Sequence, residues 1–184
     1  YINGNKVMSD SKVKRAMKKT NENGNLLNLF KQKKFVEQDF ADDLNRIVEK
    51  YNELGYRDAK ILNDSVARYN DKSVDVFIDL EEGDKYYISD IQWVGNTVYD
   101  TDVLNNVLGI YPGDVYNQKR LNKRTQEDED AVANLYLDQG YLFFNLVPIE
   151  ENIKGDSIAL QMRVIEGPQA RVNRVIINGN DQLY

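Results

Sequence analysis

The stretch that decides the fold lies at residues 136–141 and reads YLDQGY. A counterpart at residues 51–56, 85 positions upstream, reads YNELGY. Both hexapeptides begin with tyrosine and end in Gly-Tyr, and glycine is the residue most often found just past the end of a helix. We therefore expect an internal repeat in which each copy contains a helix that ends at this hexapeptide.

Two further markers recur with nearly the same period. Glu82-Gly83 and Glu166-Gly167 lie 84 residues apart, and Gly-Asn occurs at residues 4–5, 95–96 and 179–180. A period of this length exceeds that of ordinary solenoid repeats, so each copy should be a small domain. We assign residues 1–84 to a first unit with a truncated first strand, 85–168 to a complete second unit, and 169–184 to the first strand of a third.

The second unit predicts the order β-α-α-β-β. A strand over 86–94 leads into a short helix over 101–108. A long helix follows over 118–139, with Asn117 as its cap. A strand over 142–150 comes next, and the last strand shows the strict alternation of a sheet with one buried face, carried by Ile158, Leu160, Met162 and Val164.

The first unit repeats this order with an insertion between its two helices, at about residues 20–34. Its second strand is expected at 59–69. An amphipathic pattern predicts its second helix, with apolar residues at Phe40, Leu44, Ile47, Val48 and Tyr51. The fold class is therefore α+β, with two tandem units.

Composition excludes several kinds of chemistry. The 184 residues include neither Cys nor His, which removes thiol nucleophiles, imidazole bases and most zinc sites. We predict no metal and no cofactor, and the acidic run Glu127–Asp130 is interpreted as a solvated face of the long helix. The net charge of −6 and a pI of about 4.8 argue against a nucleic-acid partner. A carboxylate-dependent enzyme remains the alternative from a different class.

Membrane signals are lacking in the sequence itself. No run approaches the roughly 18 apolar residues of a membrane span. The chain also opens and closes abruptly, and we expect it to be a piece of a longer protein.

Together, the β-α-α-β-β order, the Tyr-x-x-x-Gly-Tyr hexapeptides, Glu-Gly and Gly-Asn resemble polypeptide-transport-associated (POTRA) domains. The closest likeness is to the repeats of outer-membrane β-barrel assembly factors, in the version found in Bacteroidetes. The insertion resembles that of the third repeat, so the two units would be the third and fourth, followed by the start of the fifth. The resemblance implies three-stranded mixed sheets, each covered by two helices.

The resemblance also implies binding rather than catalysis, at the periplasmic face of the outer membrane. Its implied partners are unfolded outer-membrane proteins, accessory lipoproteins, and a C-terminal membrane β-barrel absent from this sequence. A related translocation or secretion receptor with the same modules is the alternative within the class.

Such binding would occur by β-augmentation, in which an extended client pairs with an open sheet edge. By analogy with the family the second strand of each unit is that edge, and Pro148 removes a donor from the one in unit two. Unit one is therefore the expected site, near Ile61, Val66 and Tyr69, unless these residues merely face the helices.

Two other features belong to the predicted site. Leu26, Leu29 and Phe30 in the insertion either form a docking surface or pack over their own domain. Gly83 and Gly167 are expected hinges of limited range, because the joints between units are only a few residues long.

Overall fold

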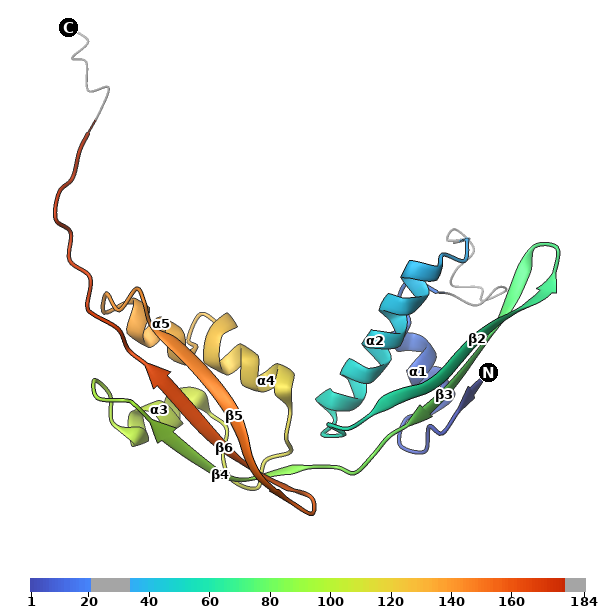
Figure 1. Ribbon diagram of the computed structural model, residues 1–184, viewed down its shortest axis with the longest axis horizontal. Helices are drawn as coiled ribbons and strands as arrows, with labels where there is room; N and C mark the ends of the chain where they lie inside the picture. Colours follow the sequence, from blue (N-terminus) through green and yellow to red (C-terminus); the bar gives the residue numbers. More distant parts are fainter. Residues whose placement is uncertain (21–33, 178–184) are drawn as a thin grey trace, which may run out of the picture.

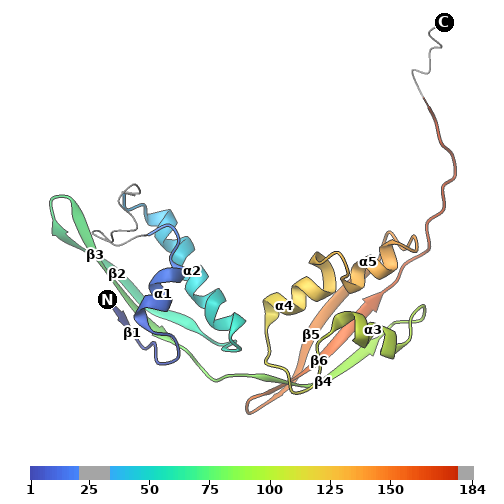
Figure 2. The same ribbon diagram turned by 180° about the vertical axis from the view of Figure 1, so that it is seen from behind.

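The computed structural model describes residues 1–20 and 34–177. It contains two units that follow one another along the chain, each with a three-stranded sheet and helices packed on one of its faces (Figures 1 and 2). The predicted α+β class and the mixed three-stranded sheets are confirmed. Leu26, Leu29 and Phe30 lie outside the described residues.

In unit one the sheet order is β1-β3-β2, with β1 parallel and β2 antiparallel to the central strand β3. Strand β1 contributes only two paired residues, as expected from its truncation. The elements are β1 (Ile2–Asn3), α1 (Asp10–Ala16), α2 (Glu37–Glu53), β2 (Lys60–Asn70) and β3 (Ser73–Glu81).

Unit two has the same topology, in the order β4-β6-β5. Its first strand is complete and pairs in parallel with β6 from Tyr87 to Val94. The elements are β4 (Tyr87–Val94), α3 (Thr101–Leu108), α4 (Gln118–Asn122), a π-helical turn (Lys123–Glu127), α5 (Val132–Leu137), β5 (Asn145–Lys154) and β6 (Ser157–Ile165).

The single long helix predicted over 118–139 is wrong. Asn117 does cap its start, accepting a hydrogen bond from the Arg120 N–H at 2.9 Å. The helix then passes into the π-helical turn and stops at Asp128, whose backbone is extended. Asn134 donates to the carbonyls of Asp128 and Glu129, satisfying the groups that the break frees. The acidic run therefore lies across a turn rather than around a helix.

Each unit has its own core between sheet and helices. The alternation predicted for β6 is confirmed, since Ile158, Leu160, Met162 and Val164 are all buried. Helix α2 buries Phe40, Ile47 and Tyr51 against β3 in the same way. Tyr56 and Tyr141 lie in the turns before the second strands, where the Tyr56 N–H donates to the Tyr51 carbonyl and the Tyr141 N–H to the Tyr136 carbonyl.

The two units meet at a polar joint. The N–H of Tyr86 donates to the carbonyl of Gly55 at 2.9 Å, and the Tyr86 hydroxyl donates to Asp58 at 2.7 Å. Arg57 reaches across to Glu150, with its Nη2 2.6 Å from one carboxylate oxygen. The joint is thus built from hydrogen bonds and ion pairs as well as from the connecting chain.

A second set of contacts joins the end of α2 to the start of α4. Lys119 Nζ lies 2.6 Å from Glu53 Oε1, and the Asn117 amide donates to the Glu53 carbonyl at 2.9 Å. Burial opposes the ionisation of Glu53, but the hydrogen bonds from Lys119 and Lys50 outweigh it and lower the pKa of this carboxyl.

Candidate functional site

Strand β2 is an edge strand, paired on one side only, with β3. Ten of its eleven residues are exposed, which leaves a long row of backbone groups accessible from the open side. Two register shifts interrupt its pairing with β3, one at Leu62 and one at Tyr69. Such bulges discourage edge-to-edge aggregation, so the regular part that can accept another strand is Asn63 to Arg68.

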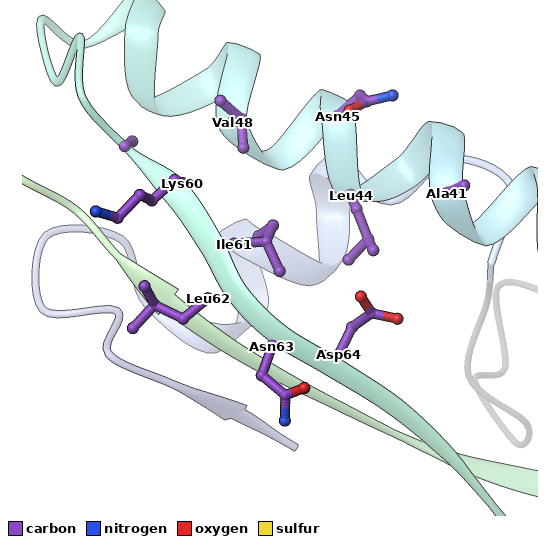
Figure 3. A pocket seen from close by; sticks show the side chains of 10 residues that line it. Ala41, Leu44, Asn45, Val48, Lys60, Ile61, Leu62, Asn63 and Asp64 are labelled. Carbon is purple, nitrogen blue, oxygen red and sulfur yellow. The ribbon is translucent and has the colours of Figure 1, made fainter.

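A groove runs between β2 and the helix above it. It has a volume of about 380 Å³ and is lined along α2 by Ala41, Leu44, Asn45 and Val48. Figure 3 shows Leu44 extending from the helix toward the strand, where Ile61 extends toward the helix. Apolar side chains therefore line a hollow directly beside the open backbone edge.

The three predicted site residues of β2, Ile61, Val66 and Tyr69, lie at different places along the strand. Ile61 lines the groove. Val66 lies opposite Val76, on the face that carries the core, and is exposed because the β2–β3 hairpin extends beyond the helices. Tyr69 lies near the tip of that hairpin and is exposed. Of the three, only Ile61 thus belongs to the groove. On α2, Leu44 and Val48 were predicted as part of the apolar face, whereas Ala41 and Asn45 were not predicted, because helical spacing does not distinguish burial from groove lining.

Unit two has an equivalent groove of about 310 Å³ between α4 and β5. Pro148 lies in its edge strand, where it lacks an N–H, and Glu150 of the same strand is engaged by Arg57 and Tyr116. Gln126 from the π-helical turn donates to the Leu146 carbonyl at 3.1 Å. The edge formed by β5 is therefore partly occupied by the protein's own side chains. The equivalent edge strand of unit one, β2, contains no proline.

The repeated sequence markers converge on one hydrogen-bonded lock in each unit. In unit one Glu82 accepts from the Tyr51 hydroxyl at 2.8 Å and from the Val7 N–H at 2.8 Å. In unit two Glu166 accepts from Tyr136 at 3.1 Å and from the Val98 N–H at 2.8 Å. The lock ties the end of the last helix to the end of the last strand and to the loop after Gly-Asn.

Ionisation in the lock follows from its burial and bonding. Burial and then the bond to Glu82 raise the pKa of the Tyr51 hydroxyl. Burial opposes the charge on Glu166, but hydrogen bonds from Thr97 and the Val98 N–H outweigh it and lower its pKa. The tyrosines therefore remain neutral hydrogen-bond donors to the two carboxyl groups, which is a structural role.

Asp43 is the most buried acidic side chain of the described residues, with no exposed surface. It accepts hydrogen bonds from the N–H groups of Lys19 and Thr20. It also forms an ion pair with Arg46, whose Nη1 lies 2.6 Å from Asp43 Oδ1. Sequence reasoning did not identify this residue, because an acid on an amphipathic helix is normally solvated. Its contacts fix the segment after α1 onto α2.

Within the described ranges 1–20 and 34–177 no group of three or more acidic side chains is arranged to hold a metal ion. In the same ranges no helix has both the length and the apolar character needed to cross a membrane.

Comparison with known proteins agrees with this architecture. The chain is 26% identical over 182 residues to the outer membrane protein assembly factor BamA of Neisseria meningitidis serogroup B, covering 97% of this chain and 22% of the relative. It is 25% identical to a putative outer membrane protein assembly factor of Treponema pallidum, covering 96% and 21% of the two chains. This chain thus spans about a fifth of the length of these curated relatives.

Solved structures show the same fold. The crystal structure of Haemophilus influenzae BamA POTRA3-5 superposes with a TM-score of 0.67 at 22% identity, over all of this chain and 70% of the other. BamA from Haemophilus ducreyi lacking POTRA domains 1-3 gives 0.55 at 17% identity, over 76% and 25%. The family model for POTRA, surface antigen variable number repeat, matches residues 1–83 and again 86–167. With both units matched in full and the β-α-α-β-β topology present twice, the chain belongs to the POTRA family.

Proposed function

We propose that this chain is a periplasmic binding scaffold for the assembly of outer-membrane β-barrel proteins, and that β2 of unit one receives an extended segment of an unfolded client. The observation that carries the proposal is the open β2 edge beside a groove whose lining is mainly apolar. Membership of the POTRA family supports it, as do the two assembly factors among its relatives.

The pairing would be set by the backbone. An added strand bonds to the exposed N–H and C=O groups of β2, whatever its sequence. Each such bond contributes a net ~0.5–1.5 kcal/mol, so a short pairing is weak and reversible. Weak binding suits a domain that holds an unfolded client only transiently before the client is released.

The groove would select client strands by their alternation of apolar and polar residues and not by the particular residues that they contain. Alternate side chains of an added strand point to the helix side of the sheet, toward Leu44 and Ile61. The transmembrane strands of β-barrels have an apolar residue at every second position. A client strand of this kind would place its apolar side chains in the groove and its polar ones toward solvent.

The alternatives differ in what the structure offers them. A translocation or secretion receptor would use the same edge, and recovery of its secreted client in a pull-down would distinguish it. A carboxylate enzyme gains no support, since the buried acids Asp43 and Glu82 bond to groups of their own unit. Accessory lipoproteins as further partners follow from the family likeness alone, and limited hinge motions at Gly83 and Gly167 follow from the short joints between units.

Isotope-edited NMR of the chain with a peptide of about ten residues from an outer-membrane strand tests the site. We expect shift changes along β2 and on the groove side of α2. Ala41→Trp should abolish them, because the indole fills the groove from an exposed helix position. Glu49→Trp is the matched control, exposed on α2 but outside the groove.

Two results would overturn the proposal. One is a peptide that binds without perturbing residues 60–70. The other is a peptide that binds Ala41→Trp as well as it binds the unchanged chain, with Glu49→Trp behaving the same.

A further inference from the structure

The far end of unit two has the geometry of the joint at the end of unit one. At the joint, the Tyr86 N–H donates to the Gly55 carbonyl at 2.9 Å. At the far end, the Ala170 N–H donates to the Gly140 carbonyl at 2.7 Å. These pairs are related by the sequence period, with offsets of 84 and 85 residues.

The linker glycines repeat the same packing. A Cβ added at Gly83 would lie 3.3 Å from Asp58 Cβ, and one added at Gly167 would lie 3.1 Å from Phe143 Cβ. Both glycines have a positive φ, at 71° and 67°. The end of unit two is thus shaped as a joint before anything is docked on it.

The chemistry of the two ends differs. Where unit one has Arg57 and Asp58, the period places Leu142 and Phe143. Arg57 and Asp58 bond across the joint to Glu150 and the Tyr86 hydroxyl. Leu142 and Phe143 can make no such bonds, and they are 61% and 68% exposed.

The residue that faces this position across the joint also changes from polar to apolar. Tyr86, whose hydroxyl Asp58 accepts, is replaced at the far end by Ala170. A polar pair at the first joint therefore corresponds to an apolar pair, Phe143 and Ala170, at the second. A coordinated exchange on both sides is expected of a contact and not of two unrelated surface positions.

We infer that Leu142 and Phe143 form an apolar docking face for the next β-α-α-β-β unit, whose first strand begins near Arg171. The observed joint supports this occupant, because the equivalent residues of unit one, Arg57 and Asp58, contact Glu150 in β5 and the Tyr86 hydroxyl of the following unit. The segment 166–177 extends away from the end of β6 (Figure 1), and its Gly167 lies against Phe143. The inference does not depend on client binding at β2.

Thiol reactivity tests the docking directly, because the 184 residues contain no cysteine. Leu142→Cys and Phe143→Cys are compared in this chain and in a longer version that carries the next unit, with any cysteine of the added part changed to serine. The control is Leu62→Cys, since Leu62 is 59% exposed and lies in β2 of unit one, outside unit two.

We expect both cysteines to react with a maleimide at least about tenfold more slowly in the longer chain, while the Leu62→Cys rate stays the same. Equal rates in the two chains would overturn the inference. So would slow reaction in the 184-residue chain that depends on its concentration, because the occupant would then be a second copy.

A charge exchange gives a second readout. Leu142→Arg with Phe143→Asp installs the residues of unit one at the second joint. In the longer chain it should broaden the distances between spin labels on unit two and on the next unit, because the new charges lack matching partners there. Unchanged distance distributions would contradict an apolar contact at this face.

Discussion

At the scale of single residues, the repeat is recognisable because each marker has a place in the same lock. Glu82 and Glu166 receive the tyrosine hydroxyl and a loop N–H in their own units. The hydroxyls of Tyr51 and Tyr136, both buried residues, donate to these carboxylates. The repeated residues therefore hold three segments together at one end of each unit: the end of the last helix, the end of the last strand and the loop after Gly-Asn.

Removing one hydroxyl should destabilise unit one. In Tyr51→Phe the ring is kept but Glu82, itself buried, loses a donor. A hydrogen bond to a charged group contributes about 1.5–3 kcal/mol, so we expect a loss of that size in unfolding free energy by urea denaturation followed by circular dichroism. Tyr69→Phe is the control, because Tyr69 is exposed. Equal stability of the two variants would show that the Tyr51 bond contributes nothing.

Acid should weaken the lock of unit two. A pKa lowered by folding means that the ionised form of Glu166 stabilises the unit, with the full effect above its ordinary value of 4.5. That contribution is lost as the pH falls through the lower, folded pKa. In urea titrations between about pH 6 and pH 3, Glu166→Gln should show a shallower loss of stability than the unchanged chain. Parallel curves would mean that Glu166 is not the group that titrates.

At the scale of elements, the edge strands distinguish the two units. Strands β2 and β5 occupy equivalent positions, but only β5 carries a proline. Proline in an edge strand removes a donor from the open side and so limits pairing with another strand. The structure thus offers one open edge in unit one and one restricted edge in unit two.

Pro148→Val should convert the second edge into a better acceptor of strands. The change restores an N–H, and valine favours a strand. We expect weak binding of outer-membrane strand peptides at β5, seen as NMR shift changes over residues 145–154 that the unchanged chain lacks. Val147→Thr, an exposed change in the same strand, is the control. An unaltered spectrum would mean that Glu150 and Gln126 block this edge without help from the proline.

The sequence predicted the sheets well and the second helix of unit two poorly. Alternation in β6 and the amphipathic pattern in α2 specify buried faces directly, so their positions were predictable. The break after Glu127 depends on the side chains of Arg124 and Asn134 reaching the turn, and such bonds leave no periodic signal. The groove needed the structure as well, because it depends on how α2 and β2, which follow one another in the chain, pack together.

At the scale of the whole molecule, the two units are held by charge at their joint. Arg57 contacts Glu150, and Lys119 contacts Glu53, across the boundary. All four side chains are partly exposed, so dissolved ions can screen these contacts. The angle between the units should therefore depend on ionic strength.

Spin labels at Ser65→Cys and Asp102→Cys would report this angle, since both sites are exposed and lie in different units. We expect the distance distribution to broaden between about 0.05 M and 1 M salt, where the screening length falls to about 3 Å. Arg57→Ala should be broad already at low salt. A distribution that stays narrow in all three cases would show that these ion pairs do not set the angle between the units.

The parallel pairing of first and last strands determines how a unit would bear mechanical load. The chain enters unit two at the start of β4 and leaves at the end of β6, and these neighbouring strands run in the same direction. Tension on the chain therefore pulls them lengthwise past one another and loads all their hydrogen bonds at once. In unit one only Ile2 and Asn3 pair in this way. In single-molecule pulling, unit one should yield at lower force than unit two, and the reverse order would show that strand pairing does not set the mechanical strength.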